Sequence, residues 1–118
     1  MPRTSGGSAQ GPTPGMYGRA ALGSCMAIGY AMRAARAGVP VRAIEVEVQA
    51  DYDDGAAFGT SDAPAGYSEV RCIVTIESDA PEADVLRVLD DADHHSPYLD
   101  VFRRAQKVTR SVRIAPPR

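Results

Sequence analysis

The sequence has no tryptophan, only two cysteines and no long apolar run. Its aromatic residues are five tyrosines and two phenylalanines, too few to indicate a surface for stacking nucleic-acid bases. No stretch approaches the roughly 18 consecutive apolar residues that mark a transmembrane helix. The formal net charge of −2 leaves no basic excess to attract nucleic acid or an anionic membrane. We therefore expect neither a nucleic-acid partner nor a membrane partner.

The two cysteines, Cys25 and Cys72, are too few for a disulfide framework. Residues 1–14 lack the apolar centre of a secretory signal peptide. We therefore expect a cytoplasmic protein in which both thiols are reduced. His94 and His95 have no Cys-x-x-Cys or His-x-x-x-His partner, so we expect no metal and no other cofactor.

The 118 residues suffice for one domain. Residues 1–13 are rich in Gly, Ser, Pro and Thr and are expected to form a flexible tail, which leaves residues 14–115 for the domain. Residues 16–37 are predicted to form a helix, apolar nearly all round between 20 and 32 and stopped by Gly38. Two alternatives stay open: one continuous helix, or a break at positions 23 and 24 with a second helix capped by Ser24.

Two segments alternate between apolar and polar residues, as half-buried strands do: residues 44–52 and 67–77. The loop between them predicts an antiparallel hairpin. Ser78 or Asp79 is expected to cap a second main helix that ends near His94, followed by a short helix at 98–104 and a last strand at 107–114. This order predicts an α+β fold, with two main helices packed on one face of an antiparallel sheet.

Three separate parts of the sequence carry recognisable motifs. Gly-Pro-Thr-Pro at residues 11–14 is followed by Ala-Ala-Leu-Gly-Ser-Cys-Met-Ala at 20–27. Ile-Glu-Ser-Asp-Ala-Pro-Glu occupies residues 76–82, and Ala-Asp-His-His-Ser-Pro-Tyr occupies 92–98. Together they resemble the reactive-cysteine segment, the strand-to-helix junction and the second conserved box of the OsmC/Ohr family. The resemblance extends over residues 11–114 and implies an OsmC-like fold with a shortened N-terminal sheet.

The resemblance also implies a homodimer, in which two long central helices lie together and are wrapped by sheets from both subunits. Active members reduce organic hydroperoxides: one cysteine attacks the peroxide, a second resolves the sulfenic acid, and external thiols regenerate the pair. Cys25 stands at the attacking position, Ser96 at the resolving position, and Gly15 where the family has an activating glutamate. The family's activating arginine comes from an N-terminal sheet, for which too few residues precede Gly11.

Cys25 is therefore the one residue to which we assign a catalytic role, since this chemistry needs a thiolate. A helix starting at Ser24 would favour the anion, whereas the structural alternative is a small apolar residue in a tight helix contact. Cys72 is expected in the core, because it shares a strand face with Val70, Val74 and Ile76. A resolving role would require its Cα within about 7 Å of that of Cys25. Arg19 is expected to be solvated or salt-bridged, unless a helix break or a dimer interface brings it to the thiol.

Two functions are consistent with these residues. The first is a thiol-dependent hydroperoxide reductase, with Cys25 as its single peroxidatic cysteine and an external thiol as reductant. The second is a non-catalytic OsmC-like module that binds a small apolar or thiol-bearing molecule or serves as a scaffold, suggested by the substitutions at Gly15 and Ser96. In both cases we expect a homodimer, because one small sheet cannot cover an apolar helix over residues 20–32.

Overall fold

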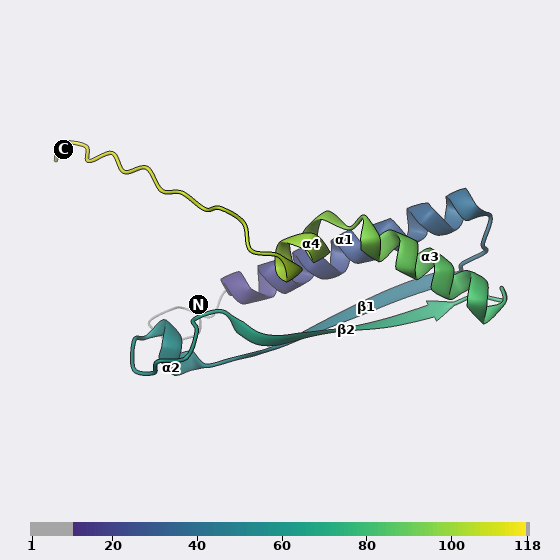
Figure 1. Cartoon of the computed structure of the whole chain (residues 1–118), viewed down its shortest axis with the longest axis horizontal. Coiled ribbons are helices and arrows are strands. Elements are labelled where there is room, and N and C mark those ends of the chain that lie inside the picture. Colours follow the sequence, from purple (N-terminus) through teal and green to yellow (C-terminus); the bar gives the residue numbers. More distant parts are fainter. Residues whose placement is uncertain (1–10, 118) are drawn as a thin grey trace.

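A long helix lies along a two-stranded sheet and is flanked by two shorter helices (Figure 1). The computed structural model describes residues 11–117, so residues 1–10 of the expected tail lie outside the described residues. The elements in chain order are α1 (Pro14–Ala37), β1 (Ala43–Tyr52), α2 (Asp54–Ala57), β2 (Tyr67–Glu77), α3 (Glu82–His94) and α4 (Pro97–Arg103). The predicted α+β class, with two main helices and an antiparallel sheet, is confirmed.

Helix α1 has well-defined ends. The Thr13 hydroxyl accepts a hydrogen bond from the Met16 amide, and Pro14 occupies the first turn, where its missing N–H costs nothing. At the other end Gly38 adopts the left-handed conformation with φ of 69° and donates to the carbonyls of Ala34 and Ala35. The predicted stop at Gly38 is confirmed.

No break interrupts α1 at positions 23 and 24, so the two-helix alternative is wrong. Gly23 instead lets the helix approach β1 closely: a Cβ there would lie 3.3 Å from Val48 Cγ2 and 3.5 Å from the Val46 carbonyl oxygen. The glycine thus serves helix–strand packing. As a consequence Cys25 sits inside a continuous helix, and the N-terminus of α1 is not at its sulfur.

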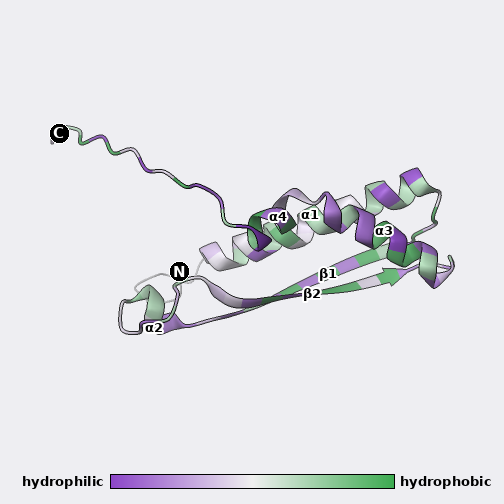
Figure 2. Cartoon of the chain, in the orientation of Figure 1, coloured by the Kyte–Doolittle hydropathy of each residue, from purple (hydrophilic) through white to green (hydrophobic). Residues whose placement is uncertain are grey.

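The hairpin of β1 and β2 packs its inner face on the helices. The strands are antiparallel, in a register that pairs Ala43 with Glu77 and Val48 with Cys72. Half-buried strand residues pack against a buried cluster formed by Leu22, Met26, Tyr30, Ala92 and Leu99. Figure 2 shows hydrophobic and hydrophilic residues interleaved along both strands, as the period of two predicts.

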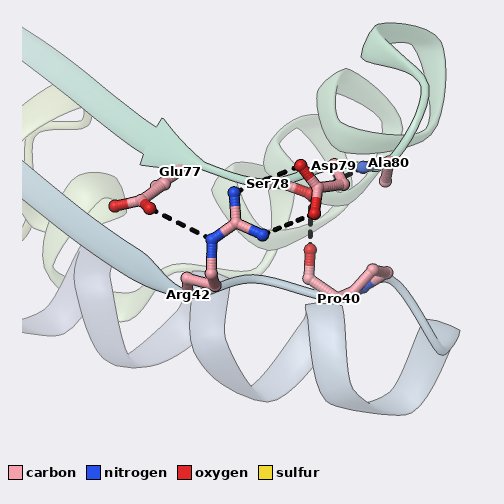
Figure 3. Close-up of polar contacts among 6 residues, drawn as sticks. All are labelled: Pro40, Arg42, Glu77, Ser78, Asp79 and Ala80. Atoms are coloured by element: carbon pink, nitrogen blue, oxygen red, sulfur yellow. Dashed lines mark hydrogen bonds and ion pairs between the residues drawn. The ribbon is translucent and has the colours of Figure 1, made fainter.

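Arg42 ties the start of the hairpin to the end of β2 (Figure 3). Its Nε donates to Glu77 Oε1 at 3.0 Å and its Nη2 donates to Asp79 Oδ1 at 3.2 Å. The Ser78 hydroxyl donates to the Pro40 carbonyl and accepts from the Ala80 amide. These bonds join the segment that leads from α1 into β1 to the segment that leads from β2 into α3, at the same end of the sheet.

The predicted caps of α3 are wrong, because the Ser78 side chain bonds to Pro40 and the Asp79 side chain bonds to Arg42. The helix begins at Glu82, after Pro81, and has no side-chain cap hydrogen bond. Acidic Glu82 and Asp84 in its first turn complement the helix dipole instead. The short helix expected at 98–104 is present as α4.

The predicted last strand at 107–114 is not formed. Residues 105–117 have neither helix nor strand and extend away from the body as an arm (Figure 1). Val108 and Ile114 are 88% and 93% exposed. A strand requires a neighbouring edge for its N–H and C=O groups, and within residues 11–117 no strand lies beside this arm.

Candidate functional site

Cys25 and Ser96, which are 71 residues apart in sequence, meet between α1 and the corner that joins α3 to α4. Cys25 Sγ lies 3.7 Å from Ser96 Oγ, within hydrogen-bond distance for sulfur. The thiol is half-buried, and Ser96 is only 8% exposed. The structure therefore brings together the two positions that the resemblance associates with the attacking and resolving cysteines.

The α3–α4 corner holds Ser96 in place through its backbone. The His95 amide donates to the Ala92 carbonyl at 3.2 Å, and the Ser96 amide donates to the Asp93 carbonyl at 3.4 Å. The Asp100 amide in turn donates to the Ser96 carbonyl at 3.1 Å. Because its backbone is bonded on both sides, the Ser96 hydroxyl is presented to α1 from a fixed corner.

A second polar contact between the same elements was not predicted from the sequence. The Tyr30 hydroxyl donates to Asp93 Oδ1 at 2.6 Å, and Tyr30 is only 2% exposed. Burial, and then the hydrogen bond and charge of Asp93, raise the pKa of Tyr30. The usable signal was the position of Tyr30 on the buried stripe of Leu22 and Met26, since a buried tyrosine hydroxyl needs a partner.

Arg19 of α1 and Tyr67 of β2 meet beside Gly15, in the first turn of α1. Arg19 Nη1 donates to the Tyr67 hydroxyl at 3.0 Å, and that hydroxyl lies 3.5 Å from the Gly15 carbonyl oxygen. A Cβ at Gly15 would come within 3.1 Å of Arg19 Nη1. Arg19 is therefore half-buried against an aromatic ring, its hydrogen bond is to Tyr67 rather than to the Cys25 sulfur, and it forms no ion pair with another of residues 11–117.

A cavity of about 620 Å³ opens between β2 and α4. Its apolar part is formed by Leu22, Met26, Val70, Val74, Leu99 and Phe102. Tyr30, Asp93 and Arg103 add polar groups, and Cys72 also lines it, whereas Cys25 does not. The cavity is therefore separate from the contact between Cys25 and Ser96.

Comparison with known proteins identifies the group to which this arrangement belongs. The family model described as "OsmC-like protein" matches residues 6–111. The chain belongs to the OsmC-like family. A crystal structure of an OsmC-like protein from Mycoplasma pneumoniae superposes with a TM-score of 0.74 at 16% identity, covering 87% of this chain and 68% of that one. No curated protein matches the chain significantly.

In this OsmC-like chain, Cys72 lies where the sequence placed it, half-buried on the inner face of β2 against the core. Burial is the main cause that raises the pKa of the Cys72 thiol, with the Asp93 charge adding to it. A thiol held in its neutral form is a poor nucleophile. These surroundings fit the core role expected for Cys72.

The two histidines of the OsmC-like chain stand at the end of α3. Their rings are edge to face with centroids 4.9 Å apart, and His95 Nδ1 lies 2.9 Å from the Asp91 carbonyl oxygen. Within residues 11–117 no three His, Cys, Asp or Glu side chains cluster as metal ligands would. In the same part of the chain, no helix combines the length and apolar character needed to cross a bilayer.

Proposed function

We propose that this OsmC-like protein is a thiol-dependent hydroperoxide reductase with Cys25 as its only reacting cysteine. The observation that carries the proposal is the 3.7 Å contact of Cys25 Sγ with Ser96 Oγ. A half-buried thiol beside a buried hydroxyl has a donor that can stabilise its anion. Reduction of the oxidised enzyme by external thiols fits a reducing compartment, for which we propose the cytoplasm.

The reaction begins with attack of the Cys25 thiolate on the terminal oxygen of the hydroperoxide. The O–O bond breaks, an S–OH bond forms, and the alkoxide leaves and takes up a proton to become an alcohol. The sulfur is oxidised to a sulfenic acid and the peroxide is reduced. An external thiol then displaces water to give a mixed disulfide, and a second thiol releases Cys25 as the thiolate together with the external disulfide.

Ser96 determines how the sulfenic acid is recovered. A hydroxyl cannot form a disulfide, so the intermediate has to wait for the external thiol. The same hydroxyl lies within reach of the oxidised sulfur and can hydrogen-bond the intermediate. Its burial at the corner favours protection of Cys25 from a second peroxide during that wait.

The proposed assembly is a homodimer joined in part through α1. Ile28 and Met32 on the outer side of this helix are 58% and 49% exposed. Beside them a groove of about 560 Å³ runs between α1 and the start of β1, lined by small and aliphatic residues such as Ala31, Ala35 and Ile44. A second α1 is the occupant that fits, because alanines allow two helix backbones to approach closely.

The arm at residues 105–117 supports the same assembly. It carries Lys107, Arg110 and Arg113 and no acidic residue, and it alternates apolar with polar positions like a strand. The outer edge of β2 has no strand partner within residues 11–117. Glu69 and Asp93 line the cavity beside β2 together with Arg103, so carboxylates outnumber cations there by two to one, which favours the basic arm. We propose that the arm of one subunit pairs with β2 of the other.

The alternative function is a non-catalytic binding module. The cavity between β2 and α4 favours it, since its size and mixed lining suit a small apolar ligand and it does not involve Cys25. In that case Cys25 would be a packing residue, and peroxide would be consumed no faster with the protein than without it.

Peroxide consumption separates the two functions. The wild type, Cys25→Ser and Cys72→Ser are each mixed with cumene hydroperoxide and dithiothreitol, and loss of peroxide is followed. We expect turnover by the wild type and by Cys72→Ser, and none by Cys25→Ser. Equal consumption by Cys25→Ser and the wild type would exclude Cys25 as the nucleophile.

A further inference from the structure

We infer that the Tyr30–Asp93 hydrogen bond positions Ser96 against Cys25, so that Tyr30 is a positioning residue for the thiol. The inference rests on the proposed function only for its catalytic consequence. Tyr30 and Cys25 both belong to α1, whereas Asp93 lies in the last turn of α3 and Ser96 in the corner that follows it. The 2.6 Å bond and the 3.7 Å contact therefore join the same two parts of the fold.

The path from Tyr30 to the sulfur is short and passes through the corner. The Asp93 side chain accepts from Tyr30, while its carbonyl accepts from the Ser96 amide. Between the two contacts Gly29 faces Ala92 closely, since a Cβ at Gly29 would lie 3.9 Å from the Ala92 Cβ. Little side-chain volume separates α1 from the corner there, so a shift of Asp93 displaces Ser96 along with it.

The burial of Tyr30 increases the contribution of its hydrogen bond with Asp93 to the position of the corner. Tyr30 is the largest side chain in the fully buried part of the core, and its hydroxyl is shielded from water except at the cavity. Loss of the partner of a buried hydroxyl destabilises the fold, so the corner is held where Asp93 can accept. The exposed ion pair of Arg33 with Asp91 at 2.9 Å joins the same helices but lies farther along α1 from the thiol.

For Cys25, the consequence is that the distance between its sulfur and the Ser96 hydroxyl oxygen is fixed. With the corner fixed, the Ser96 hydroxyl can donate to the thiolate. When the corner relaxes, that donation weakens and less of the thiol reacts at neutral pH. Removal of the Tyr30 hydroxyl should therefore change the reactivity of Cys25 only through the position of Ser96.

Alkylation of Cys25 by iodoacetamide tests this whether or not the protein consumes peroxide. The rate at Cys25 is measured by mass spectrometry of the peptides in the full chain, from pH 6 to 9 in steps of about one unit. We expect Tyr30→Phe and Ser96→Ala each to slow the reaction at pH 7 by about threefold to tenfold, the effect of one lost hydrogen bond. Both should move the rate profile to higher pH.

A double-mutant cycle distinguishes positioning from a general loosening of the fold. We expect the Tyr30→Phe/Ser96→Ala double variant to react at the rate of Ser96→Ala alone, since the two act through one contact. Rates that multiply, or a Tyr30→Phe rate and pH profile equal to the wild type, would overturn the inference. Arg33→Gln is the matched control and should leave the rate at Cys25 unchanged.

A second pair of variants applies if Tyr30→Phe does not fold. Asp93→Asn keeps an oxygen that accepts from Tyr30 and should restore most of the wild-type rate, whereas Asp93→Ala should behave as Ser96→Ala does. Equal rates for Asp93→Asn and Asp93→Ala would count against the inference. If the alkylation rates of the variants relative to the wild type follow these expectations but the wild type consumes no peroxide, the proposed function fails and the positioning role of Tyr30 stands.

Discussion

Gly23 and Val48 are in contact so close that the helix backbone rests on the strand side chain. A Cβ at position 23 would lie 3.3 Å from Val48 Cγ2, which is tighter than ordinary packing allows without movement. This contact sets the distance between α1 and β1 and thereby the depth at which α1 lies on the sheet. Elsewhere on α1, Gly18 has open space where its Cβ would be.

The first prediction follows from this difference between two glycines of one helix. Gly23→Val should lower the free energy of unfolding by about 1–3 kcal/mol, because the added methyl groups overpack the contact with Val48. Gly18→Ala is the control and should raise it by up to about 1 kcal/mol through helix propensity. Urea unfolding followed by circular dichroism measures both, and equal stabilities of the two variants would contradict the packing role of Gly23.

The second prediction concerns the missing resolving thiol. Because Cys25 Sγ already lies 3.7 Å from Ser96 Oγ, Ser96→Cys places a second sulfur near bonding distance. We expect peroxide to convert this variant to an intramolecular disulfide between positions 25 and 96, whereas the wild type should stop at the sulfenic acid. Non-reducing peptide mapping detects the bond.

A matched control for this experiment is Ser24→Cys, which adds a thiol beside Cys25 in sequence but on an exposed part of α1. It should form no intramolecular disulfide with Cys25, since adjacent helical side chains point in different directions. Disulfide formation by Ser24→Cys but not by Ser96→Cys would contradict the prediction that position 96 places a thiol within reach of the Cys25 sulfur.

The third prediction addresses the proposed homodimer. Ile28→Glu puts a charge on the exposed side of α1 and should shift the protein from dimer to monomer at micromolar concentration. Deletion of residues 105–118 should weaken the dimer by removing the strand-like arm. Sedimentation velocity measures both, and a wild type that sediments as a monomer would contradict the assembly itself.

Salt separates the two proposed contacts. Pairing of the basic arm with the acidic groups near β2 should weaken as ionic strength rises, because exposed charges are screened. The apolar contact through α1 should not weaken in this way. A full-length dimer whose dissociation constant is independent of salt would argue against the charge complementarity of the arm.

The fourth prediction is a pH dependence of stability that belongs to Tyr30. Burial and the Asp93 carboxylate raise the pKa of Tyr30, so the folded state favours the neutral hydroxyl. The resulting stabilisation is complete below the ordinary tyrosine pKa of about 10, and it is lost as the pH rises above that value because the unfolded chain then ionises first. The stability difference between the wild type and Tyr30→Phe should therefore shrink at alkaline pH. A difference that stays constant from pH 8 to about pH 11 would contradict this.

Patterns along the chain were enough to place most of the elements. The alternation at residues 44–52 and 67–77 predicted the two strands, and Gly38 predicted the end of α1, since strand and helix periods and the left-handed conformation of glycine are local properties. The motifs at residues 11–27, 76–82 and 92–98 together likewise indicated the OsmC-like family. These features depend on neighbours in sequence.

Relationships between distant parts of the fold follow from the packing and not from local sequence. The sequence leaves open a helix break at Gly23, whereas its contact with Val48 shows that it serves close packing. The sequence predicts Ser78 or Asp79 as a helix cap, whereas the Ser78 hydroxyl donates to the Pro40 carbonyl. The strand expected at 107–114 has the right alternation but does not lie beside a strand edge among residues 11–117.

The α+β class, the strands, the helix stop and the family could all be predicted before the fold was known, because they depend on local periodicity or on short motifs. The contacts of Cys25 with Ser96 and of Tyr30 with Asp93 could not, because they join residues 71 and 63 positions apart. Such pairs depend on how α1 packs against the α3–α4 corner. That packing is the sum of many small contacts, and no single stretch of sequence encodes it.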